Sequence, residues 1–170
     1  MRVRSRQTLR VRRVLLIDSG TPPPICALLP RMELPEALEF AAARRNGVLV
    51  TQKRNGRPQL SNISYAVIDG VIKISITANR AKYVNLTRNS NASLYVSRED
   101  FWGYIVIDGD AELTSVATKP DDPGVDELIE LYRAILGEHP DWDDYRRAMV
   151  ADKRVVVRLT PTHAYGMLGG

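Results

Sequence analysis

The stretch VLVTQKRNGRPQLSNISYAVIDGVIKISIT, residues 48–77, decides the fold class. It is rich in β-branched residues, which favour strands, and it contains two turn dipeptides, Asn55-Gly56 and Asp69-Gly70. Both dipeptides are strong hairpin signals between apolar runs, because their residues tolerate the positive φ angles of a tight turn. We therefore predict three strands joined as consecutive hairpins. They span residues 48–52, 59–68 and 71–77.

The third of these strands has a regular alternation. Isoleucine occupies every second position from 72 to 76, and the residues between are Lys73 and Ser75. Successive side chains of a strand point to opposite faces. We expect the isoleucine face to be buried and the polar face to line a groove or face solvent.

The rest of the chain alternates helical and strand patterns. We predict strands at residues 93–97, 104–107, 111–116 and 155–159, with Gly109-Asp110 between the second and the third. We predict helices at residues 34–45, 79–88, 123–137 and 141–150, the second capped by Asn79. Six or so short strands joined mainly by hairpins favour an antiparallel sheet that closes into a barrel. The expected fold class is mainly β with inserted helices (α+β).

Charge is distributed unevenly along the chain. The net charge of +4 comes from residues 1–31, which carry seven arginines and one acid, Asp18. The other 139 residues hold 17 basic and 19 acidic side chains, so their net charge is −2. Such a domain does not favour nucleic-acid binding. No apolar run approaches the ~18 residues that a membrane span requires.

Residues 1–31 show no sustained periodicity and contain three consecutive prolines. We predict that they are a disordered or non-native extension and that residues 32–170 form one domain. A nucleic-acid arm, an export signal and a transit peptide are the alternatives, although Asp18 interrupts the apolar stretch that an export signal needs. The single cysteine, Cys26, cannot form an internal disulfide, which fits a cytoplasmic protein.

Patterns typical of catalytic machinery are missing. The sequence has no glycine-rich phosphate loop, no nucleophile elbow and no His, Cys and Asp spacing that would bind a metal ion. Its only histidines are His139, which we place in a surface turn, and His163, which we place after the last strand. We expect no metal site and assign no catalytic residue.

One segment does point to a ligand. From Ser75 to Lys82 a strand with a polar face runs into the start of a predicted helix, and the first turn of that helix contains Arg80 and Lys82. Unpaired N–H groups and two cations at a helix N-terminus form a good phosphate site. A solvated basic turn explains the same residues equally well.

Three stretches resemble the actinobacterial deazaflavin-dependent members of the pyridoxamine-phosphate-oxidase-like family. They are Asn55–Asn62, Ser75–Lys82 followed by Asn85-Leu86, and Phe101–Tyr104. The order and spacing are similar from about residue 34 to residue 167, roughly four-fifths of the chain, and residues 1–31 are not included.

The resemblance implies an FMN-binding type of split β-barrel, a homodimer with a cofactor at the subunit interface. Arg80 and Lys82 would bind the cofactor phosphate, and Ser75 and Ala78 would line the same pocket. The residues under the tricyclic ring would be Gln59, Ser61 and Asn62. The residues that approach from the partner subunit would be Trp102, Gly103 and Tyr104.

The cofactor that the resemblance implies is the deazaflavin coenzyme F420, with FMN as the alternative. The implied function is hydride transfer to an unsaturated or quinone-like small molecule. A hydride-carrying cofactor also explains why no acid/base constellation is present. An FMN-dependent pyridoxamine-phosphate oxidase is less favoured, because no arginine follows Arg158 to bind a substrate phosphate. A non-catalytic flavin or deazaflavin carrier needs the same phosphate site and stays open.

Overall fold

The computed structural model describes residues 32–168 of the chain. The predicted extension, residues 1–31, lies outside the described residues. Six strands make the body of the structure. They are β1 (Asn46–Gln52), β2 (Pro58–Ile68), β3 (Val71–Thr77), β4 (Asn91–Ser97), β5 (Tyr104–Leu113) and β6 (Arg154–Met167).

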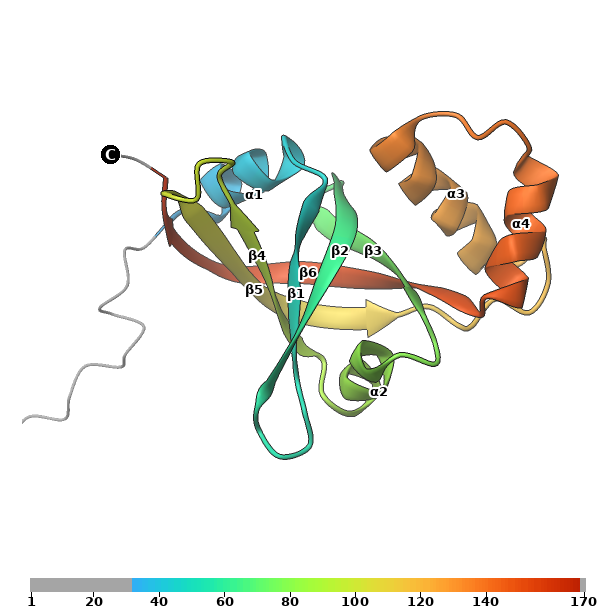
Figure 1. Ribbon diagram of the computed structural model, residues 1–170, viewed down its shortest axis with the longest axis horizontal. Coiled ribbons are helices and arrows are strands. Elements are labelled where there is room, and N and C mark those ends of the chain that lie inside the picture. Colours follow the sequence, from blue (N-terminus) through green and yellow to red (C-terminus); the bar gives the residue numbers. More distant parts are fainter. Residues whose placement is uncertain (1–31, 169–170) are drawn as a thin grey trace, which may run out of the picture.

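The strands close into one antiparallel barrel in the order β1-β2-β3-β6-β5-β4 (Figure 1). The two predicted hairpins are confirmed: Gly56 and Gly70 have φ angles of 81° and 77° at the β1–β2 and β2–β3 turns. The isoleucine face of β3 is fully buried in the barrel core. The predicted fold class, mainly β with inserted helices, is therefore correct.

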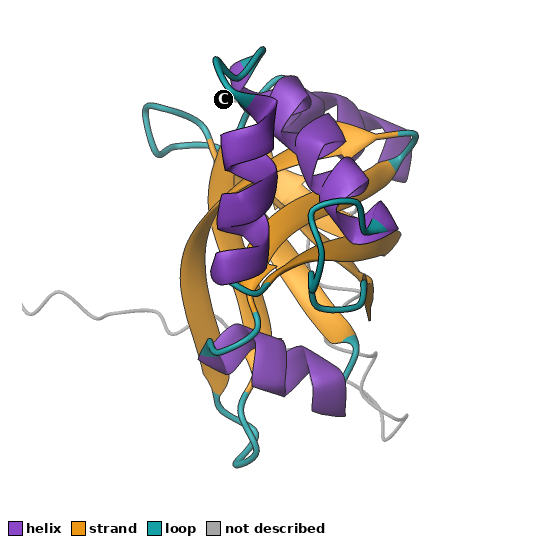
Figure 2. Ribbon diagram, turned by 90° about the vertical axis from the view of Figure 1, so that its right-hand side faces the viewer, coloured by secondary structure: helices purple, strands orange, loops and turns teal. Residues whose placement is uncertain are grey.

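The described residues form four helices, which lie at the ends and on one side of the barrel (Figure 1 and Figure 2). They are α1 (Leu34–Ala42), α2 (Ala81–Arg88), α3 (Pro123–Leu136) and α4 (Trp142–Ala151). Helices α1 and α2 lie at opposite ends of the barrel, and α3 packs on β2, β3 and β6 (Figure 1). Within residues 32–168 no helix is both long and apolar enough to cross a membrane.

The barrel is split between β2 and β3. These strands pair only at the hairpin end, where residues 65–68 of β2 face residues 71–74 of β3. Beyond that point residues 58–64 of β2 pair with β1 alone, and residues 75–77 of β3 pair with β6 alone. One long edge of β2 is therefore left without a partner strand, and helix α2 follows directly after β3.

Two predicted strand ends were wrong, and both lie near the bulge at Gly109. The predicted break at Gly109-Asp110 is a β-bulge at Asp108/Gly109 inside a continuous β5. The last strand does not end at residue 159 but continues to Met167, so His163 lies inside β6, paired with Asp108. Pro161 does not end the strand, although proline cannot donate to a sheet and is usually found at strand ends or edges. It pairs with Gly109 at the bulge, where the hydrogen-bonding ladder is already interrupted.

Two helix boundaries also differ from the predictions. Helix α1 ends at Ala42, so Arg44 and Arg45 lie beyond it. Helix α2 begins at Ala81 and its N-cap residue is Arg80, with no side-chain cap. The predicted cap by Asn79 was therefore wrong, and Arg80 precedes the first turn instead of lying within it.

Candidate functional site

A basic cavity of about 600 Å³ lies where β3, the start of α2 and the start of β6 meet. It contains three of the predicted site residues, Ser75, Arg80 and Lys82. The polar and charged residues that line it are Ser75, Thr77, Asn79, Arg80, Lys82, Asp152, Lys153 and Arg154. The cavity therefore brings together cations from segments that are more than seventy residues apart in sequence.

Most of the positive charge in this cavity is not neutralised by acids. Asp152 accepts hydrogen bonds from Arg154 at 3.2 Å. In residues 32–168 neither Arg80 nor Lys82 forms an ion pair. Burial lowers the pKa of Lys82, and the neighbouring Arg80 and Arg154 guanidinium groups lower it further. Like charges gathered in a concave surface in this way favour the binding of an anion.

Backbone groups at the start of α2 add to this positive field. No side chain caps the first turn of α2, where helical N–H groups lack partners within the helix. The N–H of Tyr83 donates to the carbonyl oxygen of Arg80 at 3.0 Å, which leaves those of Ala81 and Lys82 open within residues 32–168. Ala78, which was predicted to line the pocket, is not among the residues that line this cavity. Its N–H instead donates to the carbonyl oxygen of Lys153 at 3.0 Å, which holds β3 and the start of β6 together.

The unpaired edge of β2 forms the other side of the split. The N–H of Tyr65 donates to the carbonyl oxygen of Arg45, on the β1 side. Backbone groups alternate between the two edges of a strand, so those of Leu60 and Asn62 point away from β1, into the split. This edge offers hydrogen-bonding groups to a planar ligand.

The three residues predicted to lie under the ring do not share one face. Gln59 and Ser61 are joined by a hydrogen bond of 2.6 Å, from the Gln59 amide to the Ser61 hydroxyl. Asn62 lies between Ser61 and the buried Ile63, so its side chain points to the opposite, outer face of β2. Only the backbone of Asn62 points into the split.

Two buried polar residues near this edge were missed by the assignment of site residues. Thr51 is 2% exposed and Asn85 is 7% exposed, and the Asn85 amide donates to the Thr51 hydroxyl at 3.1 Å. The Thr51 hydroxyl donates to the Gln59 amide oxygen, also at 3.1 Å. The available signal was a polar residue at an inward position of an apolar strand, in the run Val48-Leu-Val-Thr51.

The predicted partner-facing residues lie at the far end of the barrel. Trp102 is 83% exposed in the β4–β5 loop, on the opposite side of the molecule from α2 (Figure 1). The main-chain N–H of Trp102 donates to the Asp100 carboxylate at 3.0 Å. The ring of Tyr104 stacks on that of Tyr95, with 5.7 Å between the ring centroids. Gly103 is buried against Arg98. Within one chain these residues do not reach the basic cavity.

Comparison with known protein families gives a match that spans the whole barrel and its helices. The Pyridoxamine 5'-phosphate oxidase family matches the chain over residues 34–168. The chain belongs to this family. The resemblance predicted from the sequence is thus confirmed at the level of the family and its split-barrel fold.

Solved structures with the family's fold include several with stated ligands or activities. A conserved hypothetical protein from Mycobacterium tuberculosis is 25% identical, with 82% of this chain and 93% of that chain covered and a TM-score of 0.63. An F420 reductase is 23% identical, with coverages of 74% and 94% and a TM-score of 0.56. A FAD-binding protein from Mesorhizobium loti is 18% identical, with coverages of 81% and 94% and a TM-score of 0.57. At these identities the last two show a shared fold alone.

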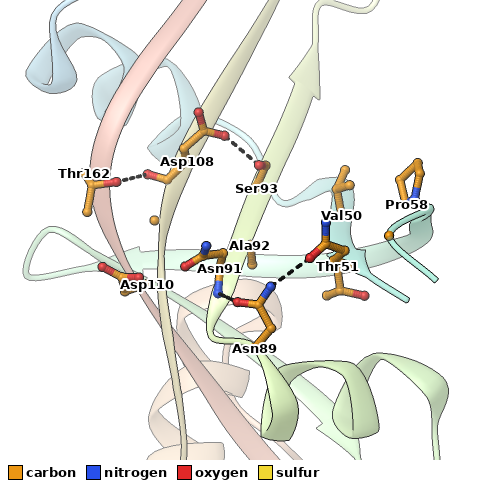
Figure 3. A pocket seen from close by; sticks show the side chains of 13 residues that line it. Val50, Thr51, Pro58, Asn89, Asn91, Ala92, Ser93, Asp108, Asp110 and Thr162 are labelled. Atoms are coloured by element: carbon orange, nitrogen blue, oxygen red, sulfur yellow. Dashed lines mark hydrogen bonds between the residues drawn. The ribbon is translucent and has the colours of Figure 1, made fainter. Parts of the chain in front are cut away.

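A second polar cavity, of about 490 Å³, is lined by residues that include Thr51 of β1, Ser93 of β4, Asp108 of β5 and Thr162 of β6 (Figure 3). Asp108 connects its walls: the carboxylate accepts from the Ser93 hydroxyl at 2.6 Å, and the main-chain oxygen accepts from Thr162 at 3.2 Å. His163 lies 3.6 Å from the same carboxylate. Asp108 thus has polar partners on β4 and β6 and joins the strands around the β5 bulge.

An apolar row crosses the outer face of four strands. Val48, Tyr95, Val106 and Tyr165 are direct cross-strand neighbours on β1, β4, β5 and β6. With Val50, Leu60 and Ser93 they line a shallow cavity of about 350 Å³. The four described helices do not cover this face (Figure 1). We call this row and its cavity the outer apolar face.

Proposed function

We propose that this protein is an F420-dependent oxidoreductase that transfers a hydride between the deazaflavin coenzyme and an unsaturated or quinone-like small molecule. One observation carries the proposal: Arg80 and Lys82 line the basic cavity without acidic partners in residues 32–168. Family membership and the F420 reductase among the proteins of the same fold support it.

The cavity residues suit the phosphate end of such a coenzyme. Arg80, Lys82 and the open N–H groups of α2 would bind the phosphate oxygens, with the Ser75 hydroxyl beside them. The N–H of Leu60 and the main-chain groups of Asn62, on the β2 edge, would hydrogen-bond the ring in the split. The coenzyme itself supplies the hydride when bound, so the protein has to hold the ring and exclude water.

We propose that a second copy of the chain covers the outer apolar face. An apolar surface of this kind, with aligned aromatic and aliphatic side chains on the outside of the barrel, typically marks a protein interface. Most of these side chains are half-buried, Val106 is buried, and Leu60 is 62% exposed. A homodimer would also give Trp102 and Phe101, both more than three-quarters exposed, a surface to contact. On this arrangement Trp102, Gly103 and Tyr104 would approach the partner's cofactor.

FMN is the alternative ligand, since its phosphate would fit the same cations and a FAD-binding protein shares the fold. A pyridoxamine-phosphate substrate is less favoured, because no arginine follows Arg158. A carrier would bind the coenzyme with the same residues as a reductase. It would differ in having no place for a second substrate that accepts the hydride.

The test has two steps. Purified protein is first titrated with coenzyme F420 and with FMN in parallel, and the fluorescence of each ligand is followed. Reduced F420 is then mixed with the protein and a series of quinones and enones, and the absorbance of oxidised coenzyme is recorded. We expect tighter binding of F420 and protein-dependent oxidation with at least one acceptor. Tighter binding of FMN would contradict the cofactor assignment, and binding without oxidation by any acceptor would favour the carrier.

A further inference from the structure

Thr51 and Asn85 form a buried polar pair at the end of the barrel where α2 closes it. Asn85 lies on α2, one turn after Lys82, and Thr51 lies on β1 next to Gln59 of β2. Their hydrogen bonds connect the helix that carries the cation site to the unpaired edge of β2. Burying polar groups costs free energy unless they are hydrogen-bonded, so two buried polar side chains at this position call for a functional explanation.

The direction of the hydrogen bonds is fixed at both ends. A guanidinium group can only donate, and Arg88 lies 3.5 Å from the Asn85 amide oxygen, so the NH₂ group of Asn85 faces Thr51. A main-chain carbonyl can only accept, and that of Leu60 is 2.9 Å from the Gln59 NH₂ group. The oxygen of Gln59 therefore faces Thr51. The Thr51 hydroxyl has to accept from Asn85 and donate to Gln59.

The chain of donors ends at Ser61. The Gln59 NH₂ group donates to the Ser61 hydroxyl oxygen at 2.6 Å. In residues 32–168 the Ser61 hydroxyl is not itself the donor of any hydrogen bond. Its proton is therefore available to a ligand atom, while the neighbouring Leu60 oxygen already accepts from the Gln59 NH₂ group.

We propose that Asn85, Thr51 and Gln59 are positioning residues that make Ser61 a hydrogen-bond donor to an acceptor atom of the bound ring. The inference rests on the proposed function. The ring of a flavin or deazaflavin has carbonyl oxygens at one edge, and the reduced ring places negative charge there. A donor at that edge stabilises the ring, while the cations of α2 bind the phosphate at the other end of the same ligand.

The test separates the two ends of the ligand. Thr51→Val removes the hydroxyl but keeps the shape, and Thr51→Ser keeps the hydroxyl. Affinity is measured for F420 and FMN by fluorescence and for inorganic phosphate by the shift of the melting temperature. We expect Thr51→Val to weaken coenzyme binding about 3- to 10-fold, since one neutral hydrogen bond is affected. Phosphate affinity should stay at the parent value, and Thr51→Ser should restore coenzyme binding.

A double-mutant cycle of Thr51→Val with Ser61→Ala tests whether Thr51 affects coenzyme binding through Ser61. If Thr51 acts through Ser61, then Thr51→Val should have little further effect in a Ser61→Ala background. Ser61→Ala removes only a half-buried hydroxyl and should fold normally. In the protein without ligand, the side-chain amide signals of Gln59 and Asn85 should also shift in Thr51→Val and not in Thr51→Ser.

Three outcomes would overturn the inference. Equal losses of coenzyme and phosphate binding in Thr51→Val would show a merely structural role. Additive effects of Thr51→Val and Ser61→Ala would show that Thr51 does not act through Ser61. Parent-like coenzyme binding by Ser61→Ala would refute the donor and leave the proposed function intact. If the parent protein bound neither F420 nor FMN, the proposed function itself would fail and this inference with it.

Discussion

Lys82 holds its charge in an unfavourable place. It is half-buried beside Arg80 and Arg154, and its pKa is lowered by burial first and by those two cations second. An anion in the cavity would reverse both effects. The charged side chain of Lys82 therefore lowers the stability of the protein without ligand and favours the binding of an anion.

Ligand binding should therefore depend on pH. Above about pH 8 the phosphate group of either ligand is fully ionised, so a difference in pH dependence between the parent and a Lys82 variant reports on Lys82. We expect the affinity for FMN or F420 to fall as the pH rises through the lowered pKa of Lys82, below its ordinary value of 10.5. Lys82→Arg stays charged over this range and should show a flat profile. Titrations at pH 8, 9 and 10 check this, and identical slopes for the parent and Lys82→Arg would contradict it.

The stability of the empty protein gives a second prediction. Because the pKa of Lys82 is lower in the folded protein than in the unfolded chain, the charged form disfavours folding below that pKa. The unfavourable contribution disappears as the pH rises toward 10.5. Lys82→Met should therefore melt at the same temperature as the parent or higher at pH 7. It should also lose the stabilisation that phosphate gives to the parent. A clearly lower melting temperature would show that Lys82 has a structural role.

Arg80 and Lys82 could be predicted from the sequence as site residues, but the residues around them could not. Arg80 and Lys82 were recognisable because two cations followed a strand with polar positions. That Lys153 and Arg154 join them could not be predicted, because the pairing of β3 with β6 is a long-range contact. The Thr51–Asn85 hydrogen bond depends in the same way on the packing of α2 against β1.

At the scale of elements, helix α3 is fastened to the barrel by Glu127. Its carboxylate accepts from Arg158 of β6 at 2.6 and 2.9 Å and lies 3.2 Å from Lys73 of β3. Hydrogen bonds from Arg158 and Lys73 hold the pKa of Glu127 below its ordinary value of 4.5. This carboxylate therefore stabilises the fold above about pH 4.5, and the contribution is lost as the pH falls through the lowered pKa.

Glu127→Gln should accordingly destabilise the protein at neutral pH. Losing a charged hydrogen-bond acceptor costs roughly 1.5–3 kcal/mol. Urea unfolding at pH 7 should show that loss, and the difference from the parent should shrink as the pH is lowered from 4.5 toward 3. Asp144→Asn, which breaks the exposed Arg147 pair on α4, is the matched control and should change little. A difference that persists unchanged at low pH would count against this account.

Elements set by local turn chemistry were predictable, and elements set by their neighbours were less so. The β1–β2 and β2–β3 hairpins follow from Asn55-Gly56 and Asp69-Gly70 alone. The bulge at Gly109 is different: a Cβ at this position would lie 2.3 Å from the carbonyl oxygen of Thr160, on the neighbouring strand. Gly109 therefore allows two strands to approach closely. From sequence alone such a glycine cannot be told from one in a turn.

The outer apolar face needs a partner, and we propose that a second copy of the chain covers it. We expect the protein to be a dimer at micromolar concentration in light-scattering measurements. Tyr95→Asp places a charge in the centre of that face and should give a folded monomer with much weaker coenzyme binding. Leu136→Asp, at an exposed apolar residue of α3, is the control and should stay a dimer. A parent protein that is monomeric and still binds coenzyme tightly would refute the partner's role in the site.

We expect the basic cavity beside the β2–β3 split to bind the phosphate of the coenzyme. Dissociation constants of F420 for the parent, Arg80→Ala and Lys82→Ala measure this. A charge-assisted hydrogen bond contributes roughly 1.5–3 kcal/mol, so each variant should bind about 10- to 150-fold more weakly. Arg45→Ala, an exposed cation at the opposite end of the barrel, should bind like the parent. If Arg80→Ala and Lys82→Ala melt normally and also bind F420 like the parent, the phosphate site lies elsewhere and the account is wrong.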